Sequence, residues 1–333
     1  MTGPGCSARD TAVPGSAPGG GPASGPSADD LLALAADAAV RAGRLLAARR
    51  PGERPEVVET KSSPTDVVTE MDRRAEALIT ERIRAVRPGD AILGEESGET
   101  RGTPGAGGAP GGGPGSAAVR WIVDPLDGTV NYLYGLPDWA VSIAAEVAGT
   151  VVAGVVASPR RGEIFTAVRG KGAWVRSAPW LEGADWAAAA GALAQPDDGQ
   201  GQRETAAVPL RCTRGVPLGQ ALVATGFGYA AGRRRIQGEV AGALLPQVRD
   251  IRRGGSAALD LCMVAAGRMD ASYERGLNYW DYAAGALIAG EAGALVGGLS
   301  GRPASPSMTI AAGPGLFEEL SAVLSRLNPE RDA

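Results

Sequence analysis

The sequence of 333 residues contains no histidine. This absence excludes Ser-His-Asp and Cys-His nucleophilic catalysis, histidine general bases and histidine-ligated zinc. Any catalysis must therefore depend on carboxylates, hydroxyls, lysine or arginine, and on metal ions that prefer oxygen ligands. The three cysteines, Cys6, Cys212 and Cys262, are an odd and scattered set. Such a set is typical of reduced thiols and not of a disulfide framework or a thiolate metal site.

Long apolar runs and basic blocks are also missing. No apolar run is long enough to span a bilayer, and residues 1–15 lack the apolar core of a signal peptide, so we expect a cytoplasmic protein. The formal net charge is -4, and without a basic block we expect neither nucleic acid nor a membrane as a partner. The hydrophobic fraction of 44% indicates a globular chain with a large core.

Composition divides the chain into a tail and one catalytic domain. Residues 1–27 are rich in Gly, Pro and Ser, which predicts a disordered tail. The domain covers 28–328, with flexible insertions expected at 97–118 and 177–207. Apolar periodicity predicts helices within 27–50, 70–86, 237–248, 256–267 and 280–296. Strands are predicted at 91–97, 121–123, 141–147, 150–158, 163–168, 172–175, 220–227 and 269–274, those of 141–175 forming an antiparallel sheet.

Several acidic residues lie where a predicted helix or strand begins or ends. Each has an alternative structural explanation: a helix cap for Asp281, a capping box for Thr69 and Asp72, a solvated strand end or a polar turn for the others. The arginines at 233–235 are expected to be solvated. If the acids converge, however, their repulsion must be neutralised, and Mg²⁺ or Mn²⁺ are the natural ions. The acids are Asp66, Asp72, Glu95, Glu96, Asp124, Asp127 and Asp281.

Gly128 and Thr129 follow Asp127 directly. A helix that begins here would point free backbone N–H groups at whatever lies beside Asp124 and Asp127, and phosphate is the usual ligand of such groups. Metal ions beside a phosphate site imply metal-assisted phosphoryl transfer.

Five segments together resemble the inositol monophosphatase family of Mg²⁺-dependent, Li⁺-sensitive phosphatases. They are DVVTEMD (66–72), GEES (94–97), WIVDPLDGTVNY (121–132), RRGGSAALDLCMVAAGRMDASYERG (252–276) and WDYAAGALIAGEAG (280–293). The resemblance covers roughly residues 28–325 apart from the insertions. It implies a five-layered αβαβα sandwich of the inositol monophosphatase and fructose-1,6-bisphosphatase type, usually as a homodimer.

The resemblance also implies roles for individual residues. Glu95, Asp124, Asp127, Asp281 and the carbonyl of Leu126 would hold two Mg²⁺ ions, with any third ion near Glu95. Thr129 and Asp72 would position or deprotonate a metal-activated water, which attacks phosphorus without a covalent intermediate. The substrate would contact Asp127, Gly128, Thr129, Gly255, Ser256, Ala257, Glu274 and Asp281.

The substrate is less constrained than the metal site. Glu274 could accept hydrogen bonds from ring hydroxyls, or it could be an exposed strand-end acid. Val130-Asn131 follow the DGT motif, as in inositol and some fructose-bisphosphate members of the family, which favours inositol 1-phosphate. Fructose 1,6-bisphosphate, histidinol phosphate and a nucleotide bisphosphate are the rival substrates. Because some bacterial relatives bind the transcription machinery, a role as a binding partner is the rival of another class.

Overall fold

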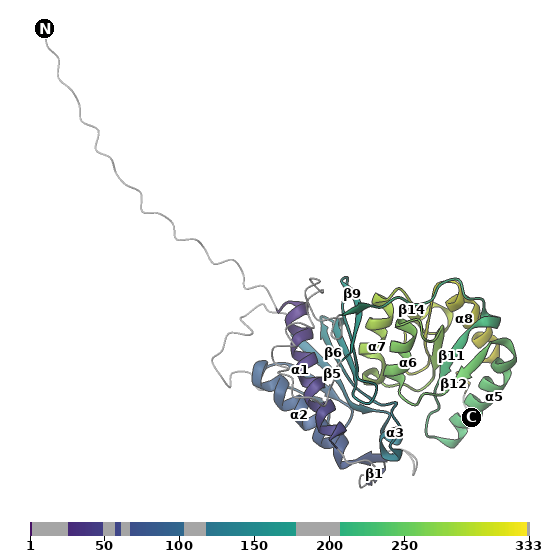
Figure 1. Ribbon diagram of the computed structural model, residues 1–333, viewed down its shortest axis with the longest axis horizontal. Helices are drawn as coiled ribbons and strands as arrows, with labels where there is room; N and C mark the ends of the chain where they lie inside the picture. Colours follow the sequence, from purple (N-terminus) through teal and green to yellow (C-terminus); the bar gives the residue numbers. More distant parts are fainter. Residues whose placement is uncertain (2–25, 49–56, 61–66, 103–117, 178–206, 332–333) are drawn as a thin grey trace.

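The computed structural model describes residues 1, 26–48, 57–60, 67–102, 118–177 and 207–331. In Figure 1 the described chain forms five layers, in the order helix pair, large sheet, helix pair, small sheet, helix pair. This is the layer order that the family resemblance implied. The described residues leave out most of the predicted tail and most of the two predicted insertions. Asp66 also lies outside them.

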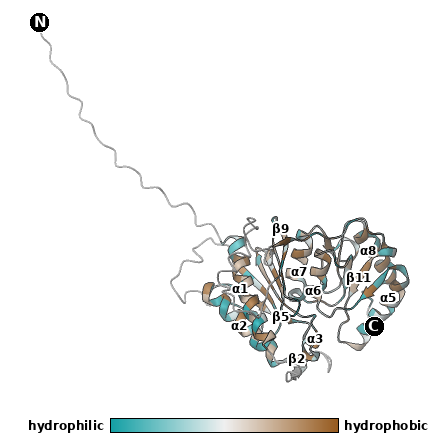
Figure 2. Ribbon diagram, in the orientation of Figure 1, coloured by the Kyte–Doolittle hydropathy of each residue, from teal (hydrophilic) through white to brown (hydrophobic). Residues whose placement is uncertain are grey.

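The first layer consists of α1 (Ala28–Ala47) and α2 (Glu70–Val86). Ser27 caps α1, as predicted, because its Oγ accepts the N–H of Asp30 at 3.1 Å. The small residues of α1, which include Ala35 and Ala39, are fully buried and let the helix lie close to the sheet. In Figure 2 the ribbons of both helices carry teal, hydrophilic residues alongside brown, hydrophobic ones. Asp37 of α1 forms an ion pair with Arg82 of α2 and thereby joins the two helices.

The large sheet has eight described strands in the order β10-β9-β8-β7-β6-β5-β3-β4. Strands β6 to β9 form the antiparallel sheet that was predicted for 141–175. One pair, β3 with β5, is parallel. The strands are β3 (Ala91–Gly94), β4 (Gly98–Thr100), β5 (Val119–Asp127), β6 (Ala140–Val147), β7 (Thr150–Ser158), β8 (Glu163–Val168), β9 (Gly172–Ser177) and β10 (Val208–Pro209). A separate two-stranded sheet joins β1 (Val57–Thr60) to β2 (Val67–Thr69).

The remaining layers lie C-terminal to the large sheet. Between the two sheets are α6 (Ala257–Ala265) and α7 (Tyr279–Glu291), and the outermost layer is α5 (Ala231–Leu244) with α8 (Leu316–Leu327). The small sheet has the order β12-β11-β13-β15-β14. Its strands are β11 (Leu222–Thr225), β12 (Asp250–Arg252), β13 (Ala271–Glu274), β14 (Leu295–Gly297) and β15 (Thr309–Ala312). A short helix, α3 (Thr129–Tyr134), follows β5.

Several boundaries differ from the prediction. The helix predicted over 280–296 ends at Glu291, because Gly293 adopts a positive φ of 92° and stops it, and β14 follows. Helix α5 begins at Ala231 and not at Gln237, since three arginines, which are good helix formers, extend it towards the N-terminus. Strand β4 occupies the start of the predicted insertion at 97–118, and β2 precedes α2 where a loop was expected.

No helix within the described ranges is long and apolar enough to cross a membrane.

Two buried helices pack at unusually short range in the central layer. A Cβ atom at Gly285 of α7 would lie 2.9 Å from Cβ of Leu261 on α6. Gly290 of the same helix has no atom within 4 Å of its Cβ position. The absence of a side chain is therefore a packing requirement at Gly285 and not at Gly290.

We therefore expect opposite effects from one substitution at these two positions. Gly285→Ala should lower the free energy of unfolding by about 1–3 kcal/mol, because it forces α6 and α7 apart. Gly290→Ala should raise it by up to about 1 kcal/mol, because alanine is the better helix former. Chemical denaturation of both variants measures the difference. Equal effects would mean that the close approach at Gly285 does not control the packing.

Candidate metal centre and active site

A cavity of about 590 Å³ opens where the large sheet, the small sheet and the central helices meet. Its walls come from the ends of β5 and β13, from the first turns of α3, α6 and α7, and from the loop before α5. The cavity contains all but one of the residues that the sequence predicted for the site; Asp72 is the exception and lies behind Thr129. Those lining it are Glu95, Asp124, Leu126, Asp127, Gly128, Thr129, Gly255, Ser256, Ala257, Glu274 and Asp281.

The parallel pairing of β3 and β5 brings the first two acids together. Gly94 pairs with Val123, so Glu95 and Asp124 are the next residues at the same edge of the sheet. The backbone N–H of Glu95 donates to the carbonyl of Val123 at 3.1 Å. Because the carboxyl ends of parallel strands meet at one edge, two acids far apart in sequence become neighbours.

A bulge in β5 places Asp124 and Asp127 on the same side of the strand. Asp124 pairs with Ser142 and Asp127 with Ala140, so β5 has one residue more than β6 across this step. Residues three apart in a regular strand point to opposite faces. The extra residue of the bulge lets the side chains of Asp124 and Asp127 point to the same face. Pro125 is tolerated within the bulge because the ladder hydrogen bonds are interrupted there.

Hydrogen bonds hold both carboxyls in place. Oδ1 of Asp124, which is only 1% exposed, accepts the backbone N–H of Leu126 at 3.0 Å. Oδ2 of Asp127 accepts the hydroxyl of Ser256 at 2.6 Å and the N–H of Ala258 at 2.7 Å. The same Ser256 oxygen caps α6 by accepting the N–H of Leu259. The Ser256 hydroxyl is therefore engaged in positioning Asp127.

Asp281 reaches the cavity from the first turn of α7. One of its carboxyl oxygens accepts the N–H of Asn278 at 2.6 Å, which is the capping contact proposed as its alternative role. The carboxyl nevertheless lines the cavity with the other acids. The helix-cap and cavity roles thus coexist in Asp281.

Glu76 supports the metal-facing loop and was missed at the sequence level. It is buried on α2, and its two carboxyl oxygens accept the N–H groups of Glu96 at 2.8 Å and Ser97 at 2.9 Å. A Cβ atom at Gly94 would overlap this carboxyl at 2.6 Å. The only sequence signal was an acid on the apolar side of α2.

Asp72 and Thr129 form a pair at the edge of the cavity. Oγ1 of Thr129 lies 3.0 Å from Oδ1 of Asp72 and 3.1 Å from the carbonyl oxygen of Leu126. The other oxygen of Asp72 accepts the N–H of Thr69 at 2.9 Å and completes the capping box of α2. Burial raises the pKa of Asp72, and the charge of Glu95 adds to the increase. Each oxygen of Asp72 therefore serves a different role.

The clustered acids oppose each other's ionisation. Burial raises the pKa of Asp124 well above its usual range, and the charges of Glu95 and Asp127 raise it further. Burial likewise raises the pKa of Asp281, followed by the charge of Glu95. Burial raises the pKa of Asp127 to about 6, although its bonds to Ser256 and Ala258 counteract the increase. Bound cations would remove this repulsion.

The donor set fits hard divalent cations. The acids and the Leu126 carbonyl supply only oxygen atoms, the ligands that Mg²⁺ and Mn²⁺ prefer. Within the described residues, no three acidic or cysteine side chains already surround one point as a finished metal cage would. Several carboxyl oxygens instead accept backbone N–H groups, so rotation of these side chains would complete an ion's ligand set.

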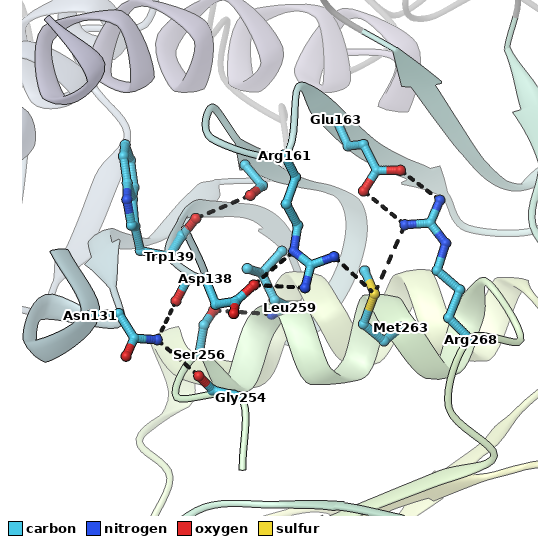
Figure 3. Close-up of polar contacts among 11 residues, drawn as sticks. Asn131, Asp138, Trp139, Arg161, Glu163, Gly254, Ser256, Leu259, Met263 and Arg268 are labelled. Carbon is cyan, nitrogen blue, oxygen red and sulfur yellow. Dashed lines mark hydrogen bonds and ion pairs between the residues drawn. The ribbon is translucent and has the colours of Figure 1, made fainter. Parts of the chain in front are cut away.

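Asn131 fixes the loop on the opposite wall (Figure 3). Its side-chain Nδ2 donates to the carbonyl of Gly254 at 2.9 Å and to the carbonyl of Asp138 at 2.6 Å. The Asp138 carboxyl in turn accepts two bonds from Arg161. A Cβ atom at Gly255 would lie 2.6 Å from the Asn131 amide, so this loop requires glycine.

Two further acids, Glu274 and Asp260, line the same cavity. Burial raises the pKa of Glu274 to about 8, helped by the charge of Asp127 and opposed by that of Arg253. Glu274 lies against Gly226, where a Cβ atom would overlap its carboxyl, so it is not an exposed strand-end acid. Asp260, buried on α6, was missed at the sequence level, where its only signal was an acid within an apolar helix.

Arg233 is exposed, as expected, but it also lines the cavity beside Gly228 and Gly276, which was not predicted. Its position depends on the fold that brings α5 next to the loop after β13, which local sequence does not reveal.

Glu274 gives a testable pH dependence. Its pKa in the folded chain, about 8, lies above the ordinary value of 4.5. Below pH 4.5 Glu274 is protonated in both the folded and the unfolded chain, so it does not affect the free energy of unfolding. Between that value and pH 8 only the unfolded chain ionises Glu274, and the free energy of unfolding therefore decreases as the pH rises. In EDTA, the unfolding free energy of the unmodified chain should therefore decrease more steeply over this range than that of Glu274→Gln.

Denaturation curves at pH 5, 6.5 and 8 measure this difference. The exposed Glu81 of α2 provides the matched control, since Glu81→Gln should follow the unmodified chain. Parallel pH profiles for Glu274→Gln and the unmodified chain would contradict the burial of an ionisable Glu274.

Comparison with known proteins agrees with this geometry. Residues 27–329 match the model of the inositol monophosphatase family. The chain is 43% identical over 303 residues to inositol-1-monophosphatase SuhB of Mycobacterium tuberculosis, covering 89% of this chain and 92% of that protein. It is 37% identical over 273 residues to Nus factor SuhB of Escherichia coli, covering 81% and 86% respectively.

Solved structures show the same fold. Mycobacterium tuberculosis SuhB superimposes with a TM-score of 0.66 at 39% identity, covering 90% of this chain and 98% of that chain. Thermotoga maritima IMPase superimposes with a TM-score of 0.69 at 29% identity, with the same coverages of 90% and 98%. The match over 27–329 and these identities place the chain in the inositol monophosphatase family.

Proposed function

We propose that the protein is a Mg²⁺-dependent phosphate monoester hydrolase that converts inositol 1-phosphate to inositol and phosphate. The observation that carries this proposal is the convergence of Glu95, Asp124, Asp127 and Asp281 in one cavity beside the start of α3. The names of relatives, which include an inositol-1-monophosphatase at 43% identity, support the substrate class. The expected homodimer stays a prediction.

The positions of the oxygen donors support the metal-binding roles that the family resemblance implies. Glu95, Asp124 and the Leu126 carbonyl would hold one Mg²⁺, while Asp124, Asp127 and Asp281 would hold a second. Glu95 would contribute to any third ion, and Mn²⁺ fits the same donors. When bound, the ions supply charge stabilisation of the phosphoryl group and a lowered pKa of water.

The Asp72 and Thr129 pair would orient the attacking water. Asp72 is 1% exposed and its Oδ1 accepts the Thr129 hydroxyl, so that hydroxyl is held in one rotamer. The lone pairs of Oγ1 then face the cavity and can accept a hydrogen bond from water. Asp72, which lies behind Thr129, would accept a proton that this water releases.

The backbone at the start of α3 would bind the phosphate. The first hydrogen bond of this helix runs from the N–H of Tyr132 to the carbonyl of Gly128 at 3.0 Å. The N–H groups of Gly128 and Thr129 precede it and have no partner within the helix. Gly128 adopts a positive φ of 95°, and a Cβ atom there would lie 2.9 Å from the Asp138 carbonyl, so glycine is required.

The opposite wall would bind the polyol. Glu274 can accept hydrogen bonds from two ring hydroxyls, while the backbone of Gly255 and Ala257 forms the adjoining surface. Asn131 holds this loop through the Gly254 carbonyl. Inositol 1-phosphate would thus place its ester between the acids and its ring against Glu274.

A second role, binding to the transcription machinery, is favoured by one observation. The Escherichia coli relative at 37% identity is named a Nus factor. Such a role needs a surface and not the cavity acids, so an inactive Asp124 variant separates it from catalysis.

The direct test is phosphate release with Mg²⁺, with and without Li⁺, on four substrates. They are inositol 1-phosphate, fructose 1,6-bisphosphate, histidinol phosphate and 3′,5′-adenosine bisphosphate. We expect Li⁺-sensitive turnover led by inositol 1-phosphate. Asp124→Asn should abolish it without loss of stability, because a buried charge is removed. Asp250→Asn, at a half-buried acid of β12 outside the cavity wall, serves as control. An active Asp124→Asn enzyme would refute the metal assignment.

Asp72→Asn should affect both activity and stability. The amide can still accept the Thr69 N–H through its oxygen but then directs its NH₂ towards Thr129, which reverses that hydrogen bond. We expect a kcat loss of about 100-fold or more for misplaced water, with about 1 kcal/mol lower stability for the weakened cap. Steady-state kinetics and denaturation measure the two effects. Normal kinetics with reduced stability would limit Asp72 to capping.

A further inference from the structure

Gln237 is a buried amide of α5 that lies behind the cavity wall. Its side chain belongs to a residue that is only 7% exposed, and a buried amide is costly unless it is hydrogen-bonded. Ile236 and Val240 of the same helix pack in the hydrophobic core with Val223 of β11. Figure 1 shows α5 beside β11 and β12 of the small sheet. Gln237 therefore extends from a firmly packed support.

The Gln237 amide forms three hydrogen bonds with two segments of the cavity wall. Its Oε1 accepts the N–H of Gly228 at 2.9 Å. Its Nε2 donates to the carbonyl of Arg275 at 3.1 Å and to the carbonyl of Gly226 at 3.4 Å. Gly226 and Gly228 follow β11, whereas Arg275 follows β13. One side chain thus joins the segments that leave two strands.

These partners require an amide of this length. One N–H and two carbonyls need one acceptor and two donors, and the side chains of Asn and Gln offer that combination. Asparagine is shorter by one carbon–carbon bond, about 1.5 Å. Glutamate would direct carboxylate oxygens at the two carbonyls in place of donors. Gln237 is therefore matched to the gap between the two segments.

The junction that Gln237 makes lies directly beside Glu274. Strands β11 and β13 are parallel neighbours, and their last paired residues are Thr225 and Tyr273. Glu274 follows Tyr273, and its carboxyl lies against Gly226, where a Cβ atom would overlap it. Beyond the strand pairing, Gln237 bonds to Gly226 and to the residue after Glu274. The spacing of the two segments, and with it the place of the Glu274 carboxyl, therefore depends on this amide.

We propose that Gln237 is the positioning residue of the polyol wall, and that through Glu274 it determines selectivity for a polyol phosphate over a monoester without hydroxyls. This inference rests on the proposed function, which assigns the ring to Glu274. Gln237 does not itself line the cavity, so it acts on the substrate through residues that do.

The test compares inositol 1-phosphate with phenyl phosphate, a monoester that lacks hydroxyls. Gln237→Leu should lower kcat/KM for inositol 1-phosphate about tenfold, mainly through KM, and change the value for phenyl phosphate by less than about twofold. The ratio of the two values does not depend on the folded fraction of the variant. If Gln237→Leu does not fold, Gln237→Asn should shift this ratio in the same direction. Gln247→Leu is the control and should leave the ratio unchanged, because Gln247 is exposed and bonds to the Ala243 carbonyl of its own helical segment.

A Glu274→Ala background distinguishes positioning of Glu274 from general support of the fold. If Gln237 acts through Glu274, Gln237→Leu should lower the ratio no further in this background. An equal loss for both substrates, or a full tenfold loss of the ratio in the Glu274→Ala background, would overturn the positioning role.

Failure of the proposed function would give a different result. If the unmodified enzyme does not hydrolyse inositol 1-phosphate, the proposed substrate is wrong, and denaturation then tests Gln237. The decrease in the unfolding midpoint caused by Gln237→Leu should be smaller in the Glu274→Ala background than in the unmodified chain, because both residues act on Gly226. Equal decreases in the two backgrounds would overturn the link between Gln237 and Glu274.

Discussion

Mutual repulsion among carboxyls in one cavity is the constraint on which the rest of this structure depends. Asp124, Asp127 and Asp281 all lie near Glu95, and each raises the pKa of another. A chain without histidine has no neutral imidazole ligand to reduce this charge. The fold must therefore hold the acids together before any cation binds, and it does so with strand pairing and backbone N–H groups.

The supporting hydrogen bonds come largely from the ends of regular elements. Asp72 and Asp281 each direct one oxygen to an N–H group that precedes a helix, and Asp127 accepts the N–H of Ala258 at the start of α6. Helix starts have spare N–H groups and positive potential, so they stabilise the anionic form of these side chains. Three helices converge on the cavity because each can offset part of the repulsion. The alternative roles weighed for these acids, cap or ligand, are therefore not exclusive.

The sequence alone was sufficient to predict features whose position depends on neighbouring residues in the chain. The apolar run that breaks at Asp124 and the antiparallel sheet of 141–175 were predicted, because period and turn residues encode them. The order of the strands in the large and small sheets was not predicted, because it depends on tertiary pairing. Glu76 and Arg233 could not be assigned in this way. Each acts on a segment that only tertiary pairing brings near it, and each resembled an ordinary polar residue of an amphipathic helix. The early end of α7 was missed because an apolar run continues past Gly293 into β14.

Glycines determine where the charges of this cavity can lie. In several places a charged side chain occupies the volume that a Cβ atom would need. In three of them the glycine and the charge belong to different segments, namely Gly94 with Glu76, Gly226 with Glu274 and Gly276 with Arg233. At these pairs the charge reaches its place because the facing segment lacks a side chain. A side chain added at the glycine and the charge could not both be accommodated there, so the two positions depend on each other.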